Sequence, residues 1–267
     1  VDPKTKINTK GPIRIGGHKI NDYRNNGPEL PVWQVITESS NLGTARIAKM
    51  IGPEKQREFL SSLGFTTPTS VEMIEASGGK PLLPKRWNEL ETMTISYGHG
   101  LSATPLHLAT GYAALANGGR LVKPTLLEGK KFDLGPQVIS KEVAENSLAM
   151  LRGVVTEGTA SLADVNGYFV AGKTGTADKP SAQGGYDKEK NITNFASIFP
   201  TYEPKYVLVV TLDEAQDTSG PEPKRTAGWT AVPVSAEIIA RVAPLLGLRP
   251  KFDNQSTVGV TLSNWQE

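Results

Sequence analysis

The sequence has 267 residues, of which 38% are hydrophobic and 21% are charged, a composition that suits a globular chain with a buried core. Lys and Arg number 29 against 27 Asp and Glu, so the chain lacks the basic excess that binds nucleic acid. Cysteine is absent and the three histidines have no second ligand at metal spacing, which argues against disulfides, thiolate catalysis and the usual metal sites.

The chain begins with a segment rich in Gly, Pro, Asn and Lys, in which residues 13–20 predict a hairpin or a loop. Apolar residues at helical spacing, often with Pro near the start and Gly after the end, then predict a series of helices. The polar triplet Ser39, Ser40 and Asn41 interrupts the first of these, so we expect it at a break between two helices. The expected helices are residues 31–51 with that break, 52–64, 104–118, 140–155 and 232–246.

Three strands are expected close together in the second half of the chain. Residues 168–172 form the first, and residues 195–199 and 206–212 the others, the last being a nearly continuous apolar run typical of a central strand. The 18-residue polar stretch between the first two, residues 177–194, is long enough to suggest a functional flap. Helices followed by adjoining strands and one last helix predict an antiparallel sheet flanked by helices, an α+β fold.

Two motifs overlap at residues 167–174, GYFVAGKT, which match the phosphate loop G-x-x-x-x-G-K-T. From Lys173 the same stretch begins the K-T-G-T of serine acyl-transfer enzymes. A phosphate loop needs a strand before its first Gly and a helix beginning at its Lys, but here strand formers fill the supposed loop and a Gly- and Pro-containing stretch follows. The strand interpretation is therefore favoured. Lys173 would supply an ammonium group, Thr174 and Thr176 hydroxyl groups, and Gly175 room for a ligand's backbone.

Ser39, Ser40 and Asn41 form the S-x-N triplet that accompanies K-T-G in penicillin-recognising enzymes. With both motifs present, the chain resembles the transpeptidase domain of class B penicillin-binding proteins over nearly residues 1–247, and the cell-division (septal) type more than the elongation type. Residues 248–267 are expected to be a C-terminal tail. The matching segments, in the family's order, are residues 38–44 (ESSNLGT), 97–106 (YGHGLSATPL), 114–119 (ALANGG), 157–160 (EGTA) and 171–177 (AGKTGTA).

The resemblance implies a penicillin-binding protein and serine β-lactamase-like fold and a peptidoglycan DD-transpeptidase activity without a cofactor. A serine would attack the D-Ala-D-Ala amide of a stem peptide, the terminal D-Ala would leave, and an amine from a neighbouring strand would take the acyl group. The implied partners are stem peptides, β-lactam antibiotics and membrane division proteins. The implied location is the periplasmic face of the bacterial inner membrane, with the anchor outside these residues.

The resemblance also assigns roles to single residues. Ser39 would relay protons to the leaving amine, Asn41 would hydrogen-bond the substrate amide, and Lys173 would tune Ser39 electrostatically across one groove. The terminal carboxylate would be held by the hydroxyls of Thr174 and Thr176, and the Thr176 N–H would supply half of an oxyanion hole. The implied substrate-binding residues are Thr174, Gly175 and Thr176.

The family's nucleophile lies in an S-x-x-K motif on a helix start, upstream of the S-x-N triplet. The one S-x-x-K in the sequence begins at Ser77, follows the triplet and contains two glycines, so we interpret it as a loop. We expect the nucleophile before Val1, no acyl-enzyme from these residues alone, and an incomplete sheet of about three strands with an open edge. The alternatives are a class A β-lactamase and a non-catalytic scaffold or drug sensor.

Overall fold

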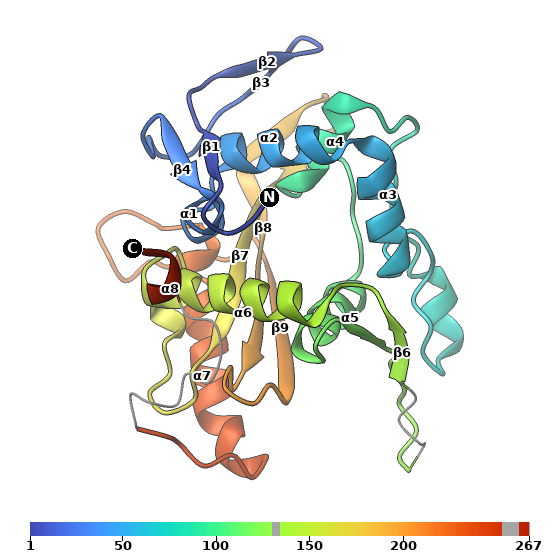
Figure 1. The fold of residues 1–267 in the computed structure, drawn as a ribbon, viewed down its shortest axis with the longest axis vertical. Helices are drawn as coiled ribbons and strands as arrows, with labels where there is room; N and C mark the ends of the chain where they lie inside the picture. The colour runs from blue at the N-terminus through green and yellow to red at the C-terminus, as the bar shows by residue number, and fades with distance from the viewer. Residues whose placement is uncertain (130–133, 253–261, 267) are drawn as a thin grey trace. The chain divides into compact units, whose positions relative to one another are not determined.

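The computed structural model describes residues 1–129, 134–252 and 262–266. The chain divides into two compact units, of which unit 1 comprises Val1–Met150 and Thr261–Glu267, and unit 2 comprises Leu151–Val260. Figure 1 traces the elements of both along the chain. Among the described residues, no helix combines the length and the apolar character that a membrane-spanning segment needs.

Short antiparallel pairs open unit 1. Residues 13–20, expected to form a hairpin or a loop, form a hairpin: Ile15 pairs with His18 across a two-residue turn of Gly16 and Gly17. Both glycines have positive φ angles, 54° and 80°, which this tight turn needs and which Gly adopts without steric cost. The pairs are β1 (Lys6–Asn8) with β4 (Glu29–Pro31), β2 (Ile13–Ile15) with β3 (His18–Ile20), and β5 (Arg120–Val122) with β6 (Leu134–Gln137).

Helices make up most of the rest of unit 1, and every helix expected from the sequence is present within a few residues. The helix α4 was not expected, although Asn88 and Glu91 form a capping box at its start that marks it in the sequence. The helices are α1 (Val32–Thr37), α2 (Asn41–Ile51), α3 (Pro53–Ser62), α4 (Glu89–Ser96), α5 (Pro105–Ala116) and α6 (Lys141–Thr156), which continues into unit 2, with a 3₁₀ turn η1 (Ile74–Gly78).

The core of unit 1 forms around α2. Leu42 and Ala45 of this helix pack with Met93 of α4 and Ile20 of β3, all of them buried. Gly43, which follows Leu42 in α2, lies so close to α1 that an added Cβ would meet the Val35 side chain at 2.6 Å. Small residues on α2 therefore let α1 and α4 approach it closely, which places the break between α1 and α2 against a packed core.

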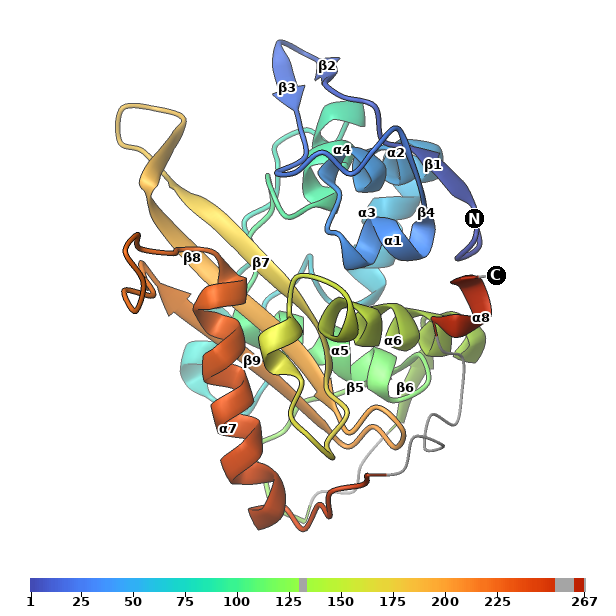
Figure 2. The ribbon, with the colours of Figure 1, turned by 90° about the vertical axis from the view of Figure 1, so that its left-hand side faces the viewer.

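Unit 2 is built on one antiparallel sheet in the order β7-β8-β9, the three strands expected. The helix α7 packs against β8 and β9, and Figure 2 shows it lying along the sheet. In the described part of the chain, no further strand pairs with β7 or β9, so both outer edges are open. The strand expected to be central, β9, is therefore an outer strand, and β8 is the central one. The elements are η2 (Ser161–Ala163), β7 (Ala171–Pro180), β8 (Tyr186–Phe199), β9 (Tyr206–Asp213), η3 (Ala227–Trp229) and α7 (Ala231–Leu245).

The start of the first strand was predicted wrongly. Tyr168 ends a turn, and Phe169 and Val170 precede β7 without regular structure, because Phe169 has a φ of 45° that breaks an extended run. Tyr168 and Val170 are nevertheless buried, so their apolar character serves the core of unit 2 and not a strand. Apolar, β-prone residues mark burial in this segment, while the strand itself begins at Ala171.

The polar stretch expected as a flap, residues 177–194, is instead the outer half of a long hairpin formed by β7 and β8. Pairing continues from Ala177 with Ile192 to Pro180 with Tyr186, with an irregularity after Asp178. The third strand stops at Asp213, opposite Ile192, so beyond that point the hairpin is a two-stranded arm, which projects past β9 in Figure 2. Hydrogen bonds between the two strands satisfy the backbone N–H and C=O groups of this polar segment, so it forms a hairpin and not a long irregular loop.

The last described residues of unit 2 pack back onto it. Leu248 is buried and donates its N–H to the Ala243 carbonyl, and Lys251 donates its N–H to the Gly167 carbonyl. Residues 253–261 and 267 of the expected tail lie outside the described residues, while α8 (Ser263–Gln266) belongs to unit 1. The domain limit at residue 247 stays a prediction.

Candidate functional site

The S-x-N triplet lies in unit 1 at the break between α1 and α2, as expected. The Ser40 N–H donates to the Val35 carbonyl at 3.0 Å and the Ser39 N–H to the Ile36 carbonyl at 3.2 Å, which is the Schellman pattern of a helix end. This pattern places Ser39 in the left-handed region, with φ at 58°, and leaves its side chain exposed. A left-handed serine is unfavourable, so another constraint has to account for the residue here.

Other helices of the chain end in the same pattern, and each has glycine where α1 has Ser39. The two closing hydrogen bonds recur at the ends of α3, α4, α5 and α7. The matching residues, all with positive φ, are Gly64, Gly98, Gly118 and Gly247. Glycine adopts this left-handed backbone with the least steric cost, so serine is unfavourable at position 39. We therefore consider the Ser39 hydroxyl a candidate functional group.

Asp22 fixes the middle of the triplet and was not singled out from the sequence. Ser40 is fully buried and caps α2 by accepting from the Gly43 N–H, while its own hydroxyl donates to Asp22 at 2.7 Å. The other oxygen of the Asp22 carboxylate accepts from the Leu42 N–H at 2.8 Å. A carboxylate bonded to the first turn of a helix also meets the positive end of the helix dipole, which stabilises this junction.

Asn41 is the first residue of α2 and is partly exposed. Its side-chain amide donates to the Asn21 carbonyl at 3.2 Å, which orients the amide oxygen away from that contact. The loop after β3 therefore anchors Asn41 through Asn21 and Ser40 through Asp22. Ser39 and Asn41 thus flank Ser40, whose buried side chain stabilises the junction between α1 and α2.

The K-T-G-T motif lies in unit 2 on β7, the edge strand of the sheet. Lys173 pairs with Ala196, Thr174 with Phe195, and Thr176 with Thr193. No helix starts at Lys173, so the phosphate-loop interpretation is excluded by the strand through it. Residues 173–176 therefore lie together along one open edge, where every second backbone group points away from β8.

Lys173 is half-buried at this edge. Its Nζ donates to the Thr174 carbonyl at 3.1 Å and approaches the Thr174 hydroxyl at 3.4 Å. Burial lowers the pKa of Lys173 to about 8 from its ordinary value of 10.5, because the protein interior disfavours the charged form. Lys173 is thus a cation that can lose its proton near neutral pH, a property common to residues at functional sites.

The two hydroxyls of the motif have partners that the sequence did not reveal. The Thr174 hydroxyl lies 2.9 Å from the hydroxyl of Thr159, and the Thr176 hydroxyl accepts from the Ala227 N–H at 3.0 Å. Thr159 belongs to the EGTA segment, which was recognised as a motif but given no role. Each partner comes from a segment outside the sheet, so the edge of β7 is lined by polar groups from three parts of unit 2.

The S-x-x-K that begins at Ser77 does not form a catalytic helix start. Ser77 lies in the 3₁₀ turn η1 and donates its hydroxyl to the Ile74 carbonyl at 3.1 Å. Both Ser77 and Lys80 are exposed. A nucleophile and its base need a shared and partly desolvated setting, which two solvated side chains do not provide.

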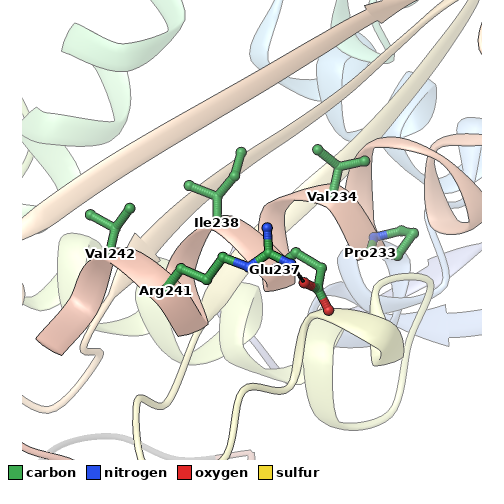
Figure 3. A pocket seen from close by; sticks show the side chains of 6 residues that line it. All are labelled: Pro233, Val234, Glu237, Ile238, Arg241 and Val242. Carbon is green, nitrogen blue, oxygen red and sulfur yellow. Dashed lines mark hydrogen bonds and ion pairs between the residues drawn. The ribbon is translucent and has the colours of Figure 1, made fainter.

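A shallow hollow lies on the outer face of α7 in unit 2, and Figure 3 shows its side chains standing along this single helix. Its charged groups pair with each other, since Arg241 donates to Glu237 at 2.7 Å. No residue expected at the active site lines it, so we assign it no chemistry. The lining residues are Pro233, Val234, Glu237, Ile238, Arg241 and Val242. In the described part of the chain, no group of His, Asp or Glu is arranged to hold a metal.

Comparison with known proteins explains why these motifs occur together. The family model of the penicillin-binding protein transpeptidase domain matches residues 1–239. The chain belongs to this family. The penicillin-binding protein family and its α+β fold, expected from the motifs, are thereby confirmed.

Individual members of the penicillin-binding protein family agree with this membership. The chain is 32% identical over 258 residues to a probable peptidoglycan D,D-transpeptidase FtsI of Caulobacter vibrioides, covering 92% of the chain and 43% of the relative. It is 33% identical over 259 residues to the penicillin-binding protein PbpB of Mycolicibacterium smegmatis, covering 89% of the chain and 39% of the relative. The chain thus spans about two fifths of the length of these relatives.

Solved structures of penicillin-binding proteins share the fold. The apo transpeptidase domain of penicillin-binding protein 3 from Burkholderia pseudomallei matches with a TM-score of 0.84 and 33% identity, covering 95% of this chain and 76% of that one. Penicillin-binding protein 3 of Mycobacterium tuberculosis, complexed with aztreonam, matches with a TM-score of 0.77 and 27% identity, covering 93% and 59%. Together with FtsI, these neighbours confirm the resemblance to the cell-division type.

Proposed function

We propose that this chain forms the substrate-recognition part of a serine-type D-Ala-D-Ala transpeptidase that cross-links peptidoglycan stem peptides during septal wall synthesis. The observation that carries the proposal is the row of hydroxyls beside Lys173 on the open edge of β7. A peptide that ends in a carboxylate needs an extended partner for its backbone and a cationic, hydroxyl-lined end for its charge. This edge offers both.

The spacing of Thr174 and Thr176 suits a carboxylate. Residues two apart on a strand lie about 6.7 Å from each other on one face, close enough for two hydroxyls to donate to the two oxygens of one carboxylate. Thr176 already accepts a hydrogen bond from Ala227, so its own proton remains for a ligand. The ammonium group of Lys173, within 3.4 Å of the Thr174 hydroxyl, adds an attractive charge.

Gly175 supports strand addition at this edge. Its φ is not positive, and an added Cβ would meet nothing closer than the Asn194 side chain at 3.8 Å. The fold would therefore tolerate a side chain at this position. We infer that glycine is kept here because a substrate backbone lies against β7 where the side chain would project.

The roles of the catalytic residues follow from the family resemblance. Ser39 relays a proton to the leaving amine, Asn41 hydrogen-bonds the substrate amide, and Lys173 adjusts the proton affinity of Ser39. The Thr176 N–H contributes to an oxyanion hole that stabilises the charge developing on the attacked carbonyl oxygen. Ser39 has an exposed side chain and a left-handed backbone, a conformation that favours glycine. The presence of serine at this position supports a functional role for its hydroxyl.

The reaction has two steps. In the first, a nucleophilic serine attacks the penultimate D-Ala carbonyl, its proton passes through the basic groups to the leaving D-Ala amine, and an acyl-enzyme forms. In the second, the amine of another stem peptide attacks that ester and releases the serine. β-Lactams would follow the first step alone, because their opened ring stays attached. We assign the nucleophile to no residue of this chain and place it upstream of Val1.

The same proposal covers the setting of the protein. The enzyme would act at the periplasmic face of the inner membrane, on stem peptides, together with membrane division proteins. β-Lactam antibiotics would compete for the edge of β7. The name of the Caulobacter relative, a probable peptidoglycan D,D-transpeptidase, supports the stem-peptide substrate, and the aztreonam complex of the Mycobacterium tuberculosis protein supports β-lactam binding.

Labelling with a fluorescent penicillin tests the proposed function. The experiment uses the intact protein, by which we mean the protein with the upstream segment proposed to carry the nucleophile. A covalent band on a denaturing gel is expected for the wild type, and Lys173→Ala should lower the labelling rate by at least about tenfold, because a charge-assisted contact is lost. Lys188→Ala, on the exposed arm, is the matched control and should label normally. A wild type that never labels would favour the non-catalytic scaffold, and rapid turnover of the penicillin would favour a β-lactamase.

A further inference from the structure

Thr159 lies beside the carboxylate-binding hydroxyls without a role in the proposed reaction. Its hydroxyl is 2.9 Å from that of Thr174, 15 residues further along the chain, and Thr159 itself is exposed. An exposed pair of hydroxyls adds little to stability, since water would satisfy both equally well. The contact therefore calls for an explanation other than folding.

The backbone around Thr159 is held firmly. Ala160 is fully buried and donates its N–H to the Val154 carbonyl at 3.0 Å. On the other side, an added Cβ at Gly228 would lie 2.8 Å from the Thr159 carbonyl oxygen, so the two backbones already touch. A side chain on so rigid a support can position another group precisely.

The hydrogen-bonding capacity of Thr174 shows what Thr159 contributes. A hydroxyl has one proton to donate and two lone pairs to accept with. The Lys173 Nζ, a donor only, lies 3.4 Å from the Thr174 oxygen and takes one lone pair. When Thr159 donates to the second lone pair, the single proton of Thr174 points outward. When Thr174 donates to Thr159, the outward proton belongs to Thr159 instead. In both arrangements the pair presents one donor to an anion.

We propose that Thr159 is a positioning residue for the substrate's terminal carboxylate: its hydroxyl orients that of Thr174, and the pair presents one directed proton to a carboxylate oxygen. This inference rests on the proposed function and adds a residue to it. Thr176, bonded to Ala227, presents the second proton in the same way. The carboxylate thus receives two protons, one from the coupled pair of Thr159 and Thr174 and one from Thr176.

The test compares two ligands in the intact protein. Acylation rates are measured for a penicillin with its free carboxylate and for the methyl ester of the same penicillin, in the wild type, Thr159→Val and Thr159→Ser. Valine keeps the shape and removes the hydroxyl, while serine restores it. Thr156→Val is the matched control, because its exposed hydroxyl donates to the Arg152 carbonyl of its own helix. Melting temperatures establish that each variant folds.

We expect Thr159→Val to lower the second-order acylation rate of the free penicillin about tenfold through weaker binding, and that of the ester less than about twofold. Thr159→Ser and Thr156→Val should stay within about twofold of the wild type for both ligands. Equal losses for the two ligands, or no loss with the free penicillin, would overturn the role of Thr159 and leave the proposed function standing. A wild type that neither ligand acylates would overturn both.

Discussion

The Thr176 hydroxyl accepts a hydrogen bond from the Ala227 N–H at 3.0 Å, although 51 residues separate the two positions. The contact ties the edge of β7 to the segment just before α7. Thr230 strengthens the same connection, since its buried hydroxyl donates to that of Thr193 at 3.0 Å on β8. The orientation of the motif's last hydroxyl thus depends on a segment that carries no catalytic residue of its own.

Gly228 tests this connection. Gly228→Ala places a Cβ 2.8 Å from the Thr159 carbonyl oxygen, a backbone atom that cannot turn away, so the segment has to shift. We expect penicillin labelling to slow at least about tenfold and the free energy of unfolding to fall by about 1–3 kcal/mol. Gly220→Ala, in the loop before this segment, has no atom within 4 Å of its added Cβ and should change neither quantity. Normal labelling by Gly228→Ala would show that the segment does not position Thr176.

We expect Ser39 to lower the stability of the fold while its hydroxyl contributes to the reaction. Ser39→Gly relieves a left-handed serine at φ 58°, and after the entropy of glycine in the unfolded chain is subtracted we expect a gain of about 0.5–1 kcal/mol. Urea unfolding measures the gain, and labelling of the intact protein should fall because the hydroxyl is gone. The reciprocal control is Gly64→Ser at the end of α3, which should destabilise the fold and leave labelling unchanged. Full labelling by Ser39→Gly would remove Ser39 from the mechanism.

Asp22 should matter for stability more than for chemistry. Its carboxylate accepts from the Ser40 hydroxyl and from the Leu42 N–H, so Asp22→Ala removes two charge-assisted bonds at the start of α2. We expect a loss of about 2 kcal/mol in the free energy of unfolding. Asp22→Asn keeps a side-chain acceptor and should lose less. Urea denaturation compares the two, and a loss below about 0.5 kcal/mol for Asp22→Ala would contradict this role.

The lowered pKa of Lys173 predicts that the free energy of unfolding depends on pH. Its pKa in the folded protein is about 8, below the ordinary value of 10.5, so between these pH values the unfolded chain binds more protons. Burying the charged form therefore costs stability below pH 8, and the cost disappears as the pH rises to 10.5. Lys173→Met should raise stability at pH 7 by on the order of 1 kcal/mol, and by progressively less above pH 8. Melting temperatures across this range check the sign, and a constant difference would refute it.

The chain alone provides a last test. We expect the 267 residues alone to form no covalent band with a fluorescent penicillin, because Ser77 lies in a 3₁₀ turn and both Ser77 and Lys80 are exposed. The intact protein, run alongside, is the positive control. A stable band from the short chain would defeat this expectation, and loss of that band in Ser77→Ala would identify Ser77 as the nucleophile.

Local signals in the sequence predicted most of the helices. The Gly52-Pro53 start of α3 and the Thr104 cap of α5 lie where expected, because caps and first-turn prolines act within a few residues. Residues 168–170 were taken for a strand, since buried aromatic and β-branched residues have the same composition in either setting. Pairing partners decide that choice, and they lie far away in the sequence.

The sequence by itself determined the family, since S-x-N, K-T-G-T and the other matching segments occur in the family's order, and the chemistry that we propose follows from those motifs without knowledge of any contact. The tertiary structure alone decided how those groups are held: the left-handed backbone of Ser39, the Asp22 carboxylate that accepts from Ser40, and Thr159 beside Thr174. A motif is local in the chain, so it can be read directly. A hydrogen bond between distant segments depends on how the whole unit packs, and no periodicity or spacing encodes it.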